Sequence, residues 1–325
     1  MGKARGKRGE MSGDKPRVSI ALPVFNGEKY IAQAVESILA QTFQNFEVII
    51  CDNASTDRTE EICRGYASRD LRLRYRRNEV NRGIHRNFTG GAKLSRGEYF
   101  MWLAHDDKLA PEFLERCVAV LDREPSAVLV YPKAIDLDDQ GNAVAYKEQS
   151  LKASSPRANE RFRELIRMEH NCEALFGLMR QNVLRRTGVL GNYADADRVL
   201  LAELSLYGCY FKVPEFLFLH REHPQRATNM YPTRFERTSS LTPEKPRQIV
   251  FPHFRQLEEY LQCIHRAPLS WTDRIRCYRE MIPWTGKYWK RLVGDVKVVV
   301  KHILRRIMRA FISPRVPAAT SGHGA

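Results

Sequence analysis

Two sequence patterns alternate along the first part of the chain: a continuous apolar run, and apolar residues at helical spacing. The opening pattern is "RVSIALPVF" (17–25), a continuous apolar run rich in β-branched residues that stops at Asn26-Gly27. Such a run, bounded by a turn signal, predicts a buried strand. The next fifteen residues predict an amphipathic helix, because apolar side chains recur there at helical spacing. These side chains are Ile31, Ala34, Val35, Ile38 and Leu39.

The same patterns recur up to residue 132. Further strands are predicted at 46–52, 71–77, 98–104 and 127–132, and further helices at 55–67, 84–95 and 111–122. Strands that alternate with helices of this length are typical of parallel βαβ units. We therefore predict an α/β fold, with a mostly parallel, Rossmann-like sheet that carries helices on both faces.

The second half of the chain is less regular. In order, it predicts a polar hairpin-like stretch at 133–156 with "DLDDQGN" as its turn, a helix at 157–169, a mixed segment at 170–191, a helix at 195–208, and two strands within 210–223 separated by a turn at Pro214. Residues 224–253 are rich in Pro, Thr, Arg and Ser and predict a long loop. From about residue 254 onward the pattern is helical, so a helical C-terminal extension follows the α/β domain.

Polar residues follow each of the first four predicted strands. They are Asn26 after the first strand, Asp52 and Asn53 after the second, Asn78 and Asn81 after the third, and His105, Asp106 and Asp107 after the fourth. Ligands of open α/β sheets bind outside the carboxyl ends of the strands. We therefore expect these polar residues to share one cleft.

Composition favours an anionic partner. The chain of 325 residues is 43% hydrophobic, enough for a full core, and 53 Lys and Arg against 38 Asp and Glu give it a formal charge of +15. That balance indicates nucleic acid, a phosphorylated ligand or an acidic membrane surface. Nucleic acid is disfavoured because residues 18–223 contain no recognised reading module.

Cysteine usage and the N-terminal residues favour a cytoplasmic protein. The seven cysteines are scattered and form no C-x-x-C pair, and the start "MGKARGKRGEMSGDK" lacks the apolar segment of a secretory signal. No apolar run approaches the roughly 18 residues of a membrane span. The inner face of a membrane, with the protein bound peripherally, is an alternative location.

Two motifs and their spacing carry a family resemblance. "VSIALPVFNGEKY" contains a P-x-[YF]-N element, "VIICDNASTDRT" contains a D-[DN]-x-S-x-D element, and "NRGIHRNFTGGAKLSRGEYFMWLAHDD" follows. Together they resemble family 2 glycosyltransferases from residue 18 to about residue 223. The resemblance implies a GT-A fold and inverting transfer of a sugar from a nucleotide-diphosphate sugar, with UDP or dTDP favoured, in cell-surface polysaccharide or glycolipid synthesis.

The resemblance assigns donor-binding roles to the strand ends. Asp52 would accept an N–H from a nucleobase edge, and Pro23, Phe25 and Asn26 would form the wall around base and ribose. The alternatives are a carboxylate in a helix-start loop and an ordinary strand-to-helix turn. The remaining donor-binding candidates are Asn53, Asn81, Asn87, Asp106 and Arg221.

Asp106 and Asp107 are the candidate metal ligands. The family carries a D-x-D metal site here, and a nucleotide diphosphate needs a hard divalent cation, Mn²⁺ or Mg²⁺, to neutralise its charge. Ala104 stands where the family has its first carboxylate, so the two aspartates would hold the ion with His223 of "LHREH" as a third ligand. The alternative is a solvated loop before the helix that starts near Pro111.

Asp197 is the candidate general base. The family places this carboxylate in an [ED]-D-x-x-L element at a helix start, and Asp197 with Leu200 fits that register in "ADADRVLLAEL", although Ala196 replaces the preceding acid. A carboxylate that removes the acceptor proton assists attack on the anomeric carbon. The alternative is that Asp195 and Asp197 cap the helix.

The chain is expected to divide into three parts. Residues 1–16 form a disordered basic N-terminus, 17–235 a GT-A domain with a nucleotide-binding half (17–132) and an acceptor half (133–235), and 236–325 a linker and a basic amphipathic tail. The tail has an apolar stripe beside a cationic one and would bind an anionic membrane surface, pack on the catalytic domain or form a homo-oligomer. The acceptor would be a saccharide or lipid-linked. Ala104 and Ala196 leave a catalytically impaired sugar-nucleotide-binding module as an alternative, with a nucleic-acid-binding protein behind it.

Overall fold

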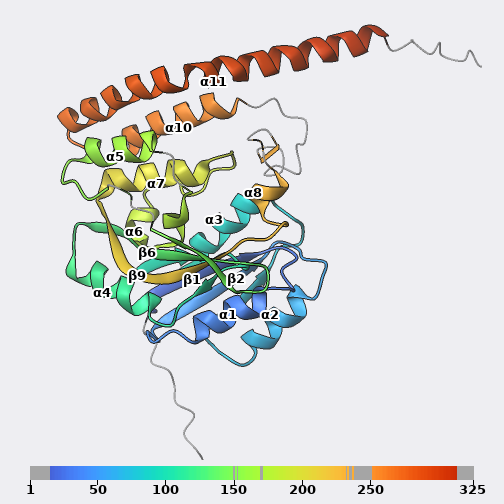
Figure 1. Ribbon diagram of the computed structural model, residues 1–325, viewed down its shortest axis with the longest axis vertical. Coiled ribbons are helices and arrows are strands. Elements are labelled where there is room, and N and C mark those ends of the chain that lie inside the picture. The colour runs from blue at the N-terminus through green and yellow to red at the C-terminus, as the bar shows by residue number, and fades with distance from the viewer. Residues whose placement is uncertain are drawn as a thin grey trace, which may run out of the picture.

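The computed structural model describes residues 15–148, 151, 153–168, 171–231, 233, 236–237 and 251–312. Within them, nine strands form one mixed, mostly parallel sheet in the order β3-β2-β1-β4-β8-β6-β9-β5, with β7 beside β6 (Figure 1). The predicted α/β fold with helices on both faces is confirmed. Most of the predicted N-terminal segment 1–16 lies outside the described residues.

The first four strands are parallel, as predicted. They are β1 (Val18–Val24), β2 (Phe46–Asp52), β3 (Leu73–Arg77) and β4 (Tyr99–Trp102). All residues of β1, β2 and β4 are buried, because both faces of the sheet are covered and the strands are near-continuous apolar runs. The intervening helices are α1 (Ile31–Leu39), α2 (Thr59–Ala67), α3 (Ile84–Leu94) and α4 (Phe113–Arg123).

Two hydrophobic clusters cover the two faces of the sheet. One contains apolar side chains of α1, α2 and α4, and the other contains those of α3 and of the later helices. Figure 1 accordingly shows α1 and α2 on one side of the sheet and α3 on the other. This arrangement leaves the carboxyl ends of the strands as the edge at which a ligand can approach.

Five further strands complete the mixed sheet. They are β5 (Lys108–Leu109), β6 (Ala127–Leu137), β7 (Ala143–Lys147), β8 (Leu178–Arg180) and β9 (Cys209–Arg221). The predicted hairpin is present as β6 and β7. β8 lies antiparallel between β4 and β6, while β9 lies parallel to β6 along its length.

The predicted turn at Pro214 is wrong. β9 is one continuous strand in which Val213 pairs with Pro132 and Phe216 with Lys133, so that Pro214 and Glu215 form a bulge between them. Proline has no backbone N–H to donate, and a bulge is one of the few places where a strand tolerates it. The strand therefore runs on to Arg221 at the cleft.

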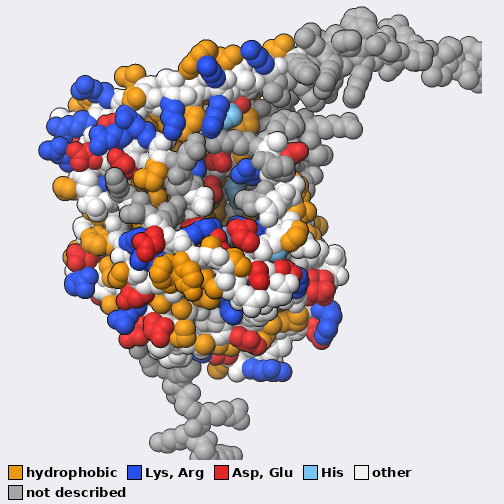
Figure 2. Space-filling model, in the orientation of Figure 1, with side chains coloured by type: hydrophobic (Ala, Val, Ile, Leu, Met, Phe, Trp, Pro, Cys, Tyr) orange, Lys and Arg blue, Asp and Glu red, His pale blue; other side chains and the backbone are white. Residues whose placement is uncertain are grey.

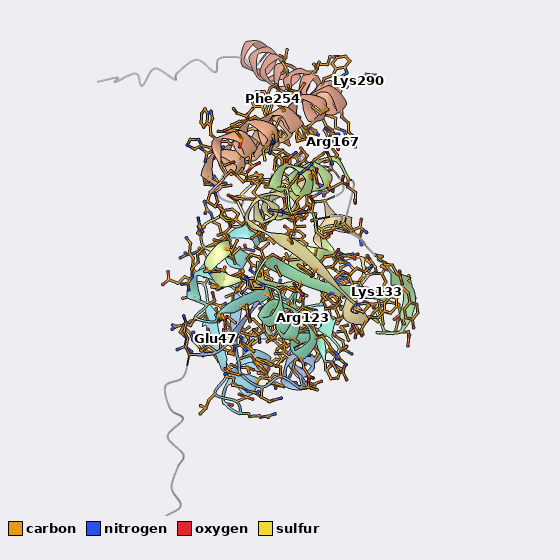
Figure 3. The ribbon with its side chains drawn as sticks, turned by 90° about the vertical axis from the view of Figure 1, so that its left-hand side faces the viewer. Glu47, Arg123, Lys133, Arg167, Phe254 and Lys290 are labelled. Carbon is orange, nitrogen blue, oxygen red and sulfur yellow. The ribbon has the colours of Figure 1, made fainter. Side chains whose placement is uncertain are left out.

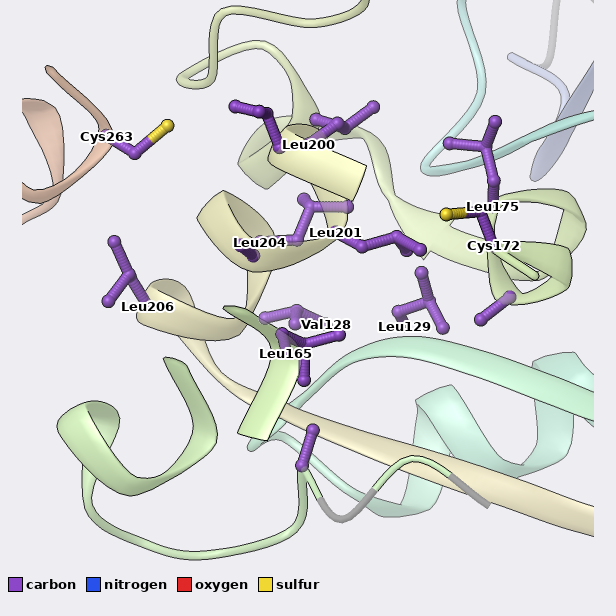
Figure 4. Packing of buried hydrophobic residues seen from close by; sticks show 14 of the residues in the cluster. Val128, Leu129, Leu165, Cys172, Leu175, Leu200, Leu201, Leu204, Leu206 and Cys263 are labelled. Carbon is purple, nitrogen blue, oxygen red and sulfur yellow. The ribbon is translucent and has the colours of Figure 1, made fainter. Parts of the chain in front are cut away.

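Helices of the second half form a layer over one face of the sheet. They are α5 (Ala158–Arg167), a 3₁₀ turn (Glu173–Phe176), α6 (Gln181–Leu184), α7 (Ala196–Tyr207), α8 (Ala227–Met230), α10 (Pro252–Arg266) and α11 (Trp271–Ile312). Figure 4 shows Leu200, Leu201 and Leu204 of α7 near Val128 and Leu129 of β6. The predicted loop 224–253 contains α8, and its central part, 238–250, lies outside the described residues.

The C-terminal helices form the outermost layer. Figure 3 shows α10 and α11 beyond α5, with Arg167 of α5 beneath them. The Arg167 side chain pairs with Glu280 at 2.8 Å, and its backbone oxygen accepts from Lys287 Nζ at 3.0 Å. Trp284 is buried against Tyr260 with ring centroids 5.6 Å apart. Among the described helices, none is both long and apolar enough to cross a membrane.

Candidate active site

The polar ends of the first three strands lie together. The backbone N–H of Asn53 donates to Val24 O at 2.9 Å, and that of Asn78 donates to Asp52 O at 2.8 Å. The Asn87 side chain donates to Cys51 O at 2.7 Å. The ends of β1, β2 and β3 and the first turn of α3 are therefore fastened to one another.

Side-chain amides connect these ends into a network. Asn53 donates to Asn81 Oδ1 at 2.8 Å, and its own Oδ1 accepts from Asn78 at 3.1 Å and from the Arg82 backbone at 2.9 Å. Asn87 Oδ1 accepts from Asn78 at 3.3 Å. The network fixes the loop between β3 and α3 against the end of β2. Direct contact of Asn53, Asn81 or Asn87 with a donor stays a prediction.

Asp52 is fully buried at the end of β2. Its Oδ1 accepts from the backbone N–H and the hydroxyl of Ser55 at 2.8 and 2.6 Å, and its Oδ2 accepts from the Tyr75 hydroxyl at 2.5 Å. Arg77 Nε lies 3.7 Å from Oδ2. Three donors therefore already hold the Asp52 carboxylate in place. To accept an N–H from a nucleobase as predicted, Asp52 would have to use a lone pair that these donors leave unoccupied.

The end of β1 forms a tight turn against the start of α2. Asn26 has φ 50°, in the left-handed region, and its Oδ1 accepts from the Thr56 backbone at 2.9 Å. Phe25 beside it is exposed, whereas Pro23 lies within β1 opposite Cys51. The turn interpretation of Asn26 therefore applies, and the exposed ring of Phe25 is free to contact a base.

Two imidazoles face the acid pair. His223 Nε2 lies 2.9 Å from Asp106 Oδ2, and His220 Nδ1 lies 3.1 Å from Asp107 Oδ1. Burial disfavours the charged form of Asp106, but the charges of His105 and His223 outweigh it and hold its pKa well below the ordinary value. Burial raises the pKa of Asp107 despite its contact with His220. The predicted ligands Asp106 and His223 are thus in contact, while Asp107 faces a different histidine.

Arg221 is fully buried beneath the acid pair. Its guanidinium donates to the backbone oxygens of Asp106, Asp138 and Asp139 at 3.1 to 3.2 Å and to Gln33 Oε1 at 2.8 Å, and its backbone N–H donates to Asp107 Oδ1 at 2.9 Å. These bonds join the acid pair, the β6–β7 turn and α1. Arg221 therefore holds the loop in place, and its contact with a donor stays a prediction.

Sequence reasoning missed a second group of possible metal ligands. One ligand atom from each of Asp136, His220 and Glu222 lies within 4.8 Å of the other two. The trio forms because β6 and β9 pair with Asp136 opposite His220, a proximity for which the sequence offers no signal. Two cations compete for these acids: Lys147 Nζ lies 2.7 Å from Asp136, and Arg226 pairs with Glu222.

Asp197 lies in the first turn of α7, near the first turn of α3. His85, in the first turn of α3, is half-buried near Asp195 and Asp197, and its Nδ1 lies 2.7 Å from Gly191 O. Asp195 occupies the N-cap position with φ 64° and makes no side-chain capping bond. The capping alternative therefore lacks its hydrogen bond at Asp195 but has one at Asp197, whose Oδ1 accepts from the Arg198 backbone N–H at 2.8 Å. The role of Asp197 as the base stays a prediction.

Comparison with known proteins places this geometry in a family. Residues 19–187, more than half of the chain, match the model described as "Glycosyl transferase family 2". An uncharacterized glycosyltransferase of Rickettsia felis is 32% identical over 164 residues, which cover 49% of this chain and 27% of the relative. One of Rickettsia typhi is 28% identical over 231 residues, or 70% of each chain. A chondroitin synthase of Escherichia coli is 36% identical over 130 residues, or 40% of this chain and 19% of the synthase.

Solved structures share the fold. Residues 1–349 of TarS from S. aureus superpose with a TM-score of 0.60 at 17% identity, covering 86% of this chain and 79% of that one. The mannosyltransferase PcManGT from Pyrobaculum calidifontis, in complex with GDP-Man and Mn²⁺, superposes with a TM-score of 0.51 at 14% identity, covering 90% and 88%. At these identities the likeness concerns the GT-A fold alone.

Proposed function

Because the chain belongs to glycosyl transferase family 2 and is a glycosyltransferase, we propose that it moves a sugar from a nucleotide-diphosphate sugar to an acceptor hydroxyl with inversion. The observation that carries this proposal is that the parallel strands β2, β1 and β4 bring Asp52 with its asparagine network and the loop of Asp106 to the same edge of the sheet. UDP or dTDP is the favoured nucleotide. TarS has been solved with UDP-GlcNAc and PcManGT with GDP-Man, which supports a donor of this class.

In the proposed reaction, Asp197 accepts the proton of the acceptor hydroxyl as its oxygen attacks the anomeric carbon. The bond from that carbon to the diphosphate oxygen breaks, and the electron pair leaves with the nucleoside diphosphate. General-base assistance of this kind contributes about 10²–10⁴-fold. Asp52 and the exposed ring of Phe25 would orient the base, and the asparagine network would fix the loop around the donor.

The residues at the end of β4 fit a divalent cation, Mn²⁺ or Mg²⁺. Asp106 is held ionised with the His223 imidazole 2.9 Å away, and Asp107 lies beside it, which gives the oxygen and nitrogen donors that such ions accept. A cation bound there would neutralise charge on the departing diphosphate. Among the described residues, the trio of Asp136, His220 and Glu222 is the competing metal site.

Asp197→Asn tests the proposed chemistry. We expect nucleotide release in the presence of acceptor to fall about 10²–10⁴-fold, while thermal stabilisation by UDP-, dTDP- or GDP-sugars with Mn²⁺ is kept. Asp195→Asn is the matched control, since it removes a neighbouring carboxylate of the same helix start. Equal loss of turnover and donor binding in Asp197→Asn would assign the residue a structural role. Donor binding without turnover in the unaltered protein would favour the impaired binding module, which Ala104 and Ala196 suggest.

The acceptor is proposed to be a saccharide or a lipid-linked saccharide of cell-surface polysaccharide or glycolipid synthesis. We place the protein in the cytoplasm, with the C-terminal helix on the anionic inner face of a membrane. Exposed apolar side chains along α11 support this location, and Figure 2 shows them interspersed with Lys and Arg. We also propose that the chain divides into a GT-A domain at 17–235 and a tail at 236–325.

A further inference from the structure

A large cavity lies on the far side of the loop that precedes α7. Its volume is about 1010 Å³, and its walls are the loop 188–193, α7, α10 and one residue of α11. The loop separates it from the donor cleft, because Gly191 O lies 2.7 Å from His85 and Leu190 O accepts from Thr89 at 3.0 Å, both on α3. The other side of the same loop lines the cavity.

Charged groups that already pair with each other line this cavity. Glu203 of α7 is buried, accepts from Arg266 Nε at 2.9 Å and from the Gly188 backbone at 3.0 Å, and so fastens α10 and the loop to α7. Arg255 pairs with Glu259 at 2.5 Å. Together with Glu258, the lining carries three carboxylates and two guanidiniums.

Two further features point to a ligand. The Oδ1 atom of Asn192, which lines the cavity, is buried without a hydrogen-bond partner among the described residues. An unpaired buried acceptor is costly, and a small rotation of the Asn192 side chain would bring this oxygen to the cavity wall, where a bound hydroxyl could donate to it. Aromatic rings of Tyr193, Phe251 and Phe254 also line the cavity, and Arg255 lies over the Tyr193 ring at 5.5 Å from its centroid.

We propose that this cavity binds the saccharide chain of the acceptor, an inference that rests on the proposed function. A hydroxyl both donates and accepts, so it can bridge a carboxylate and a guanidinium that lie side by side. Three carboxylates against two guanidiniums disfavour a phosphate or another strong anion, and the ion pairs disfavour an acyl chain. The volume is at the upper end of ordinary small-molecule sites, large enough for several sugar units.

The location suits an acceptor chain whose end reacts at Asp197. Asp197 and Glu203 belong to the same helix, six residues apart, which corresponds to about 9 Å along its axis. A chain held against Glu203 would need to pass the loop at Asn192 and Tyr193 to reach the predicted base. The cavity therefore selects the sugars that precede the acceptor hydroxyl.

Two variants with matched controls test this binding site. Val296→Trp places an indole in the cavity, whereas Val293→Trp adds the same bulk one turn away, outside it; the two valines are 43% and 41% exposed. Phe254→Ala removes a lining ring, and Leu261→Ala truncates an exposed residue of α10 outside the lining. The probes are maltohexaose, cellohexaose, chitohexaose and a chondroitin hexasaccharide, titrated into the full chain, with the melting temperature measured for every variant.

At least one hexasaccharide should bind the unaltered protein, and both cavity variants should weaken it tenfold or more while the controls bind normally. Slow nucleotide release from UDP-GlcNAc with Mn²⁺, measured without acceptor, should be unchanged in all four variants. Binding that is equal in Val296→Trp, Phe254→Ala and their controls overturns the cavity proposal, as does a failure of all four probes to bind. If no donor is turned over or bound by the unaltered protein, the proposed function fails instead.

Discussion

At the residue scale, the acid pair at the end of β4 is matched by two histidines, His220 in β9 and His223 just after it. Asp106 contacts His223 and Asp107 contacts His220, and Arg221 between the histidines holds the loop from below. Two adjacent carboxylates repel each other when no counter-charge is near. The imidazoles supply that counter-charge, and their contribution depends on pH.

The pairing of His223 with Asp106 predicts a window of added stability. The hydrogen bond to Asp106 raises the pKa of His223, so the contribution of His223 is complete below its unfolded pKa of about 6.5 and is lost as pH rises through the folded value. The pKa of Asp106 is lowered, so its contribution is present above about pH 3.9, its unfolded value, and is lost as pH falls through the folded one. The pair therefore stabilises most between about pH 4 and 6.5.

His223→Gln should remove this pH dependence. With EDTA present, the unaltered protein and the variant should differ most in melting temperature near pH 6, and the difference should shrink as pH rises to 9. His265→Gln, at the end of α10, is the control and should change the profile little. A difference that is constant from pH 5 to 9 would mean that the charge pair contributes no pH-dependent stability.

Competing metal sites can be told apart by single substitutions. If the cation binds at the end of β4, Asp106→Ala or Asp107→Ala should abolish Mn²⁺-dependent turnover, and Asp136→Asn should retain it. Asp136 belongs to the other trio, where Lys147 already pairs with it at 2.7 Å. Titration of Mn²⁺ against nucleotide release checks the three variants. The opposite ranking would assign the ion to Asp136, His220 and Glu222, and full activity in excess EDTA would exclude a metal requirement.

At the scale of elements, the sequence predicted those helices and strands whose own residues carry a hydrophobic pattern. The parallel strands and their helices were predictable because each strand is a continuous apolar run and each helix has an amphipathic period. The three-residue strand β8 was not, because it has no pattern of its own and exists through pairing with β4 and β6. His220 was missed for a similar reason, since its partner Asp107 lies 113 positions earlier and reaches it through the β5–β9 pairing.

A carboxylate of α11, Asp295, stabilises the N-terminus of α10. Asp295 Oδ2 accepts from the backbone N–H of His253 at 2.7 Å and of Phe254 at 3.3 Å, and its Oδ1 lies 2.7 Å from His253 Nδ1. No side chain within α10 caps this end, so Asp295 replaces an N-cap residue. The cap comes from a residue far along the chain and was not visible in the sequence.

Asp295→Ala should therefore lower the free energy of unfolding by about 1 kcal/mol, in the range of a lost helix cap. Urea unfolding, followed by circular dichroism, measures the change. Glu258→Ala, an exposed acid of α10 that pairs with Arg255 on the surface, is the control and should cost less, because exposed pairs contribute little. A loss no greater than that of the control would mean that the contacts of Asp295 with α10 do not stabilise the helix.

At the scale of the whole molecule, α11 has two different apolar faces. Cys277, Met281 and Trp284 are buried in the core of the helical layer. Ile275, Ile282 and Trp289, spaced seven residues apart, are exposed along another face, which ends before Val296 in the wall of the cavity. The sequence predicted an amphipathic tail and left open whether it packs on the protein or meets a membrane. The structure shows packing by one face and leaves a second apolar face uncovered within the described residues.

The uncovered face predicts binding to anionic vesicles. Lys287, Lys290, Arg291 and Lys297 flank it, and residues 296–325 contain no acidic residue, so apolar contact and charge attraction act together. Trp289→Glu in the full chain should reduce flotation with phosphatidylglycerol vesicles at least tenfold, and high salt should weaken binding of the unaltered protein. Tyr146→Glu on β7 is the matched control, since Tyr146 is 66% exposed and Trp289 is 55% exposed. Vesicle binding that survives Trp289→Glu would reject the membrane role, and a concentration-dependent mass increase lost in this variant would assign the face to a second copy of the chain.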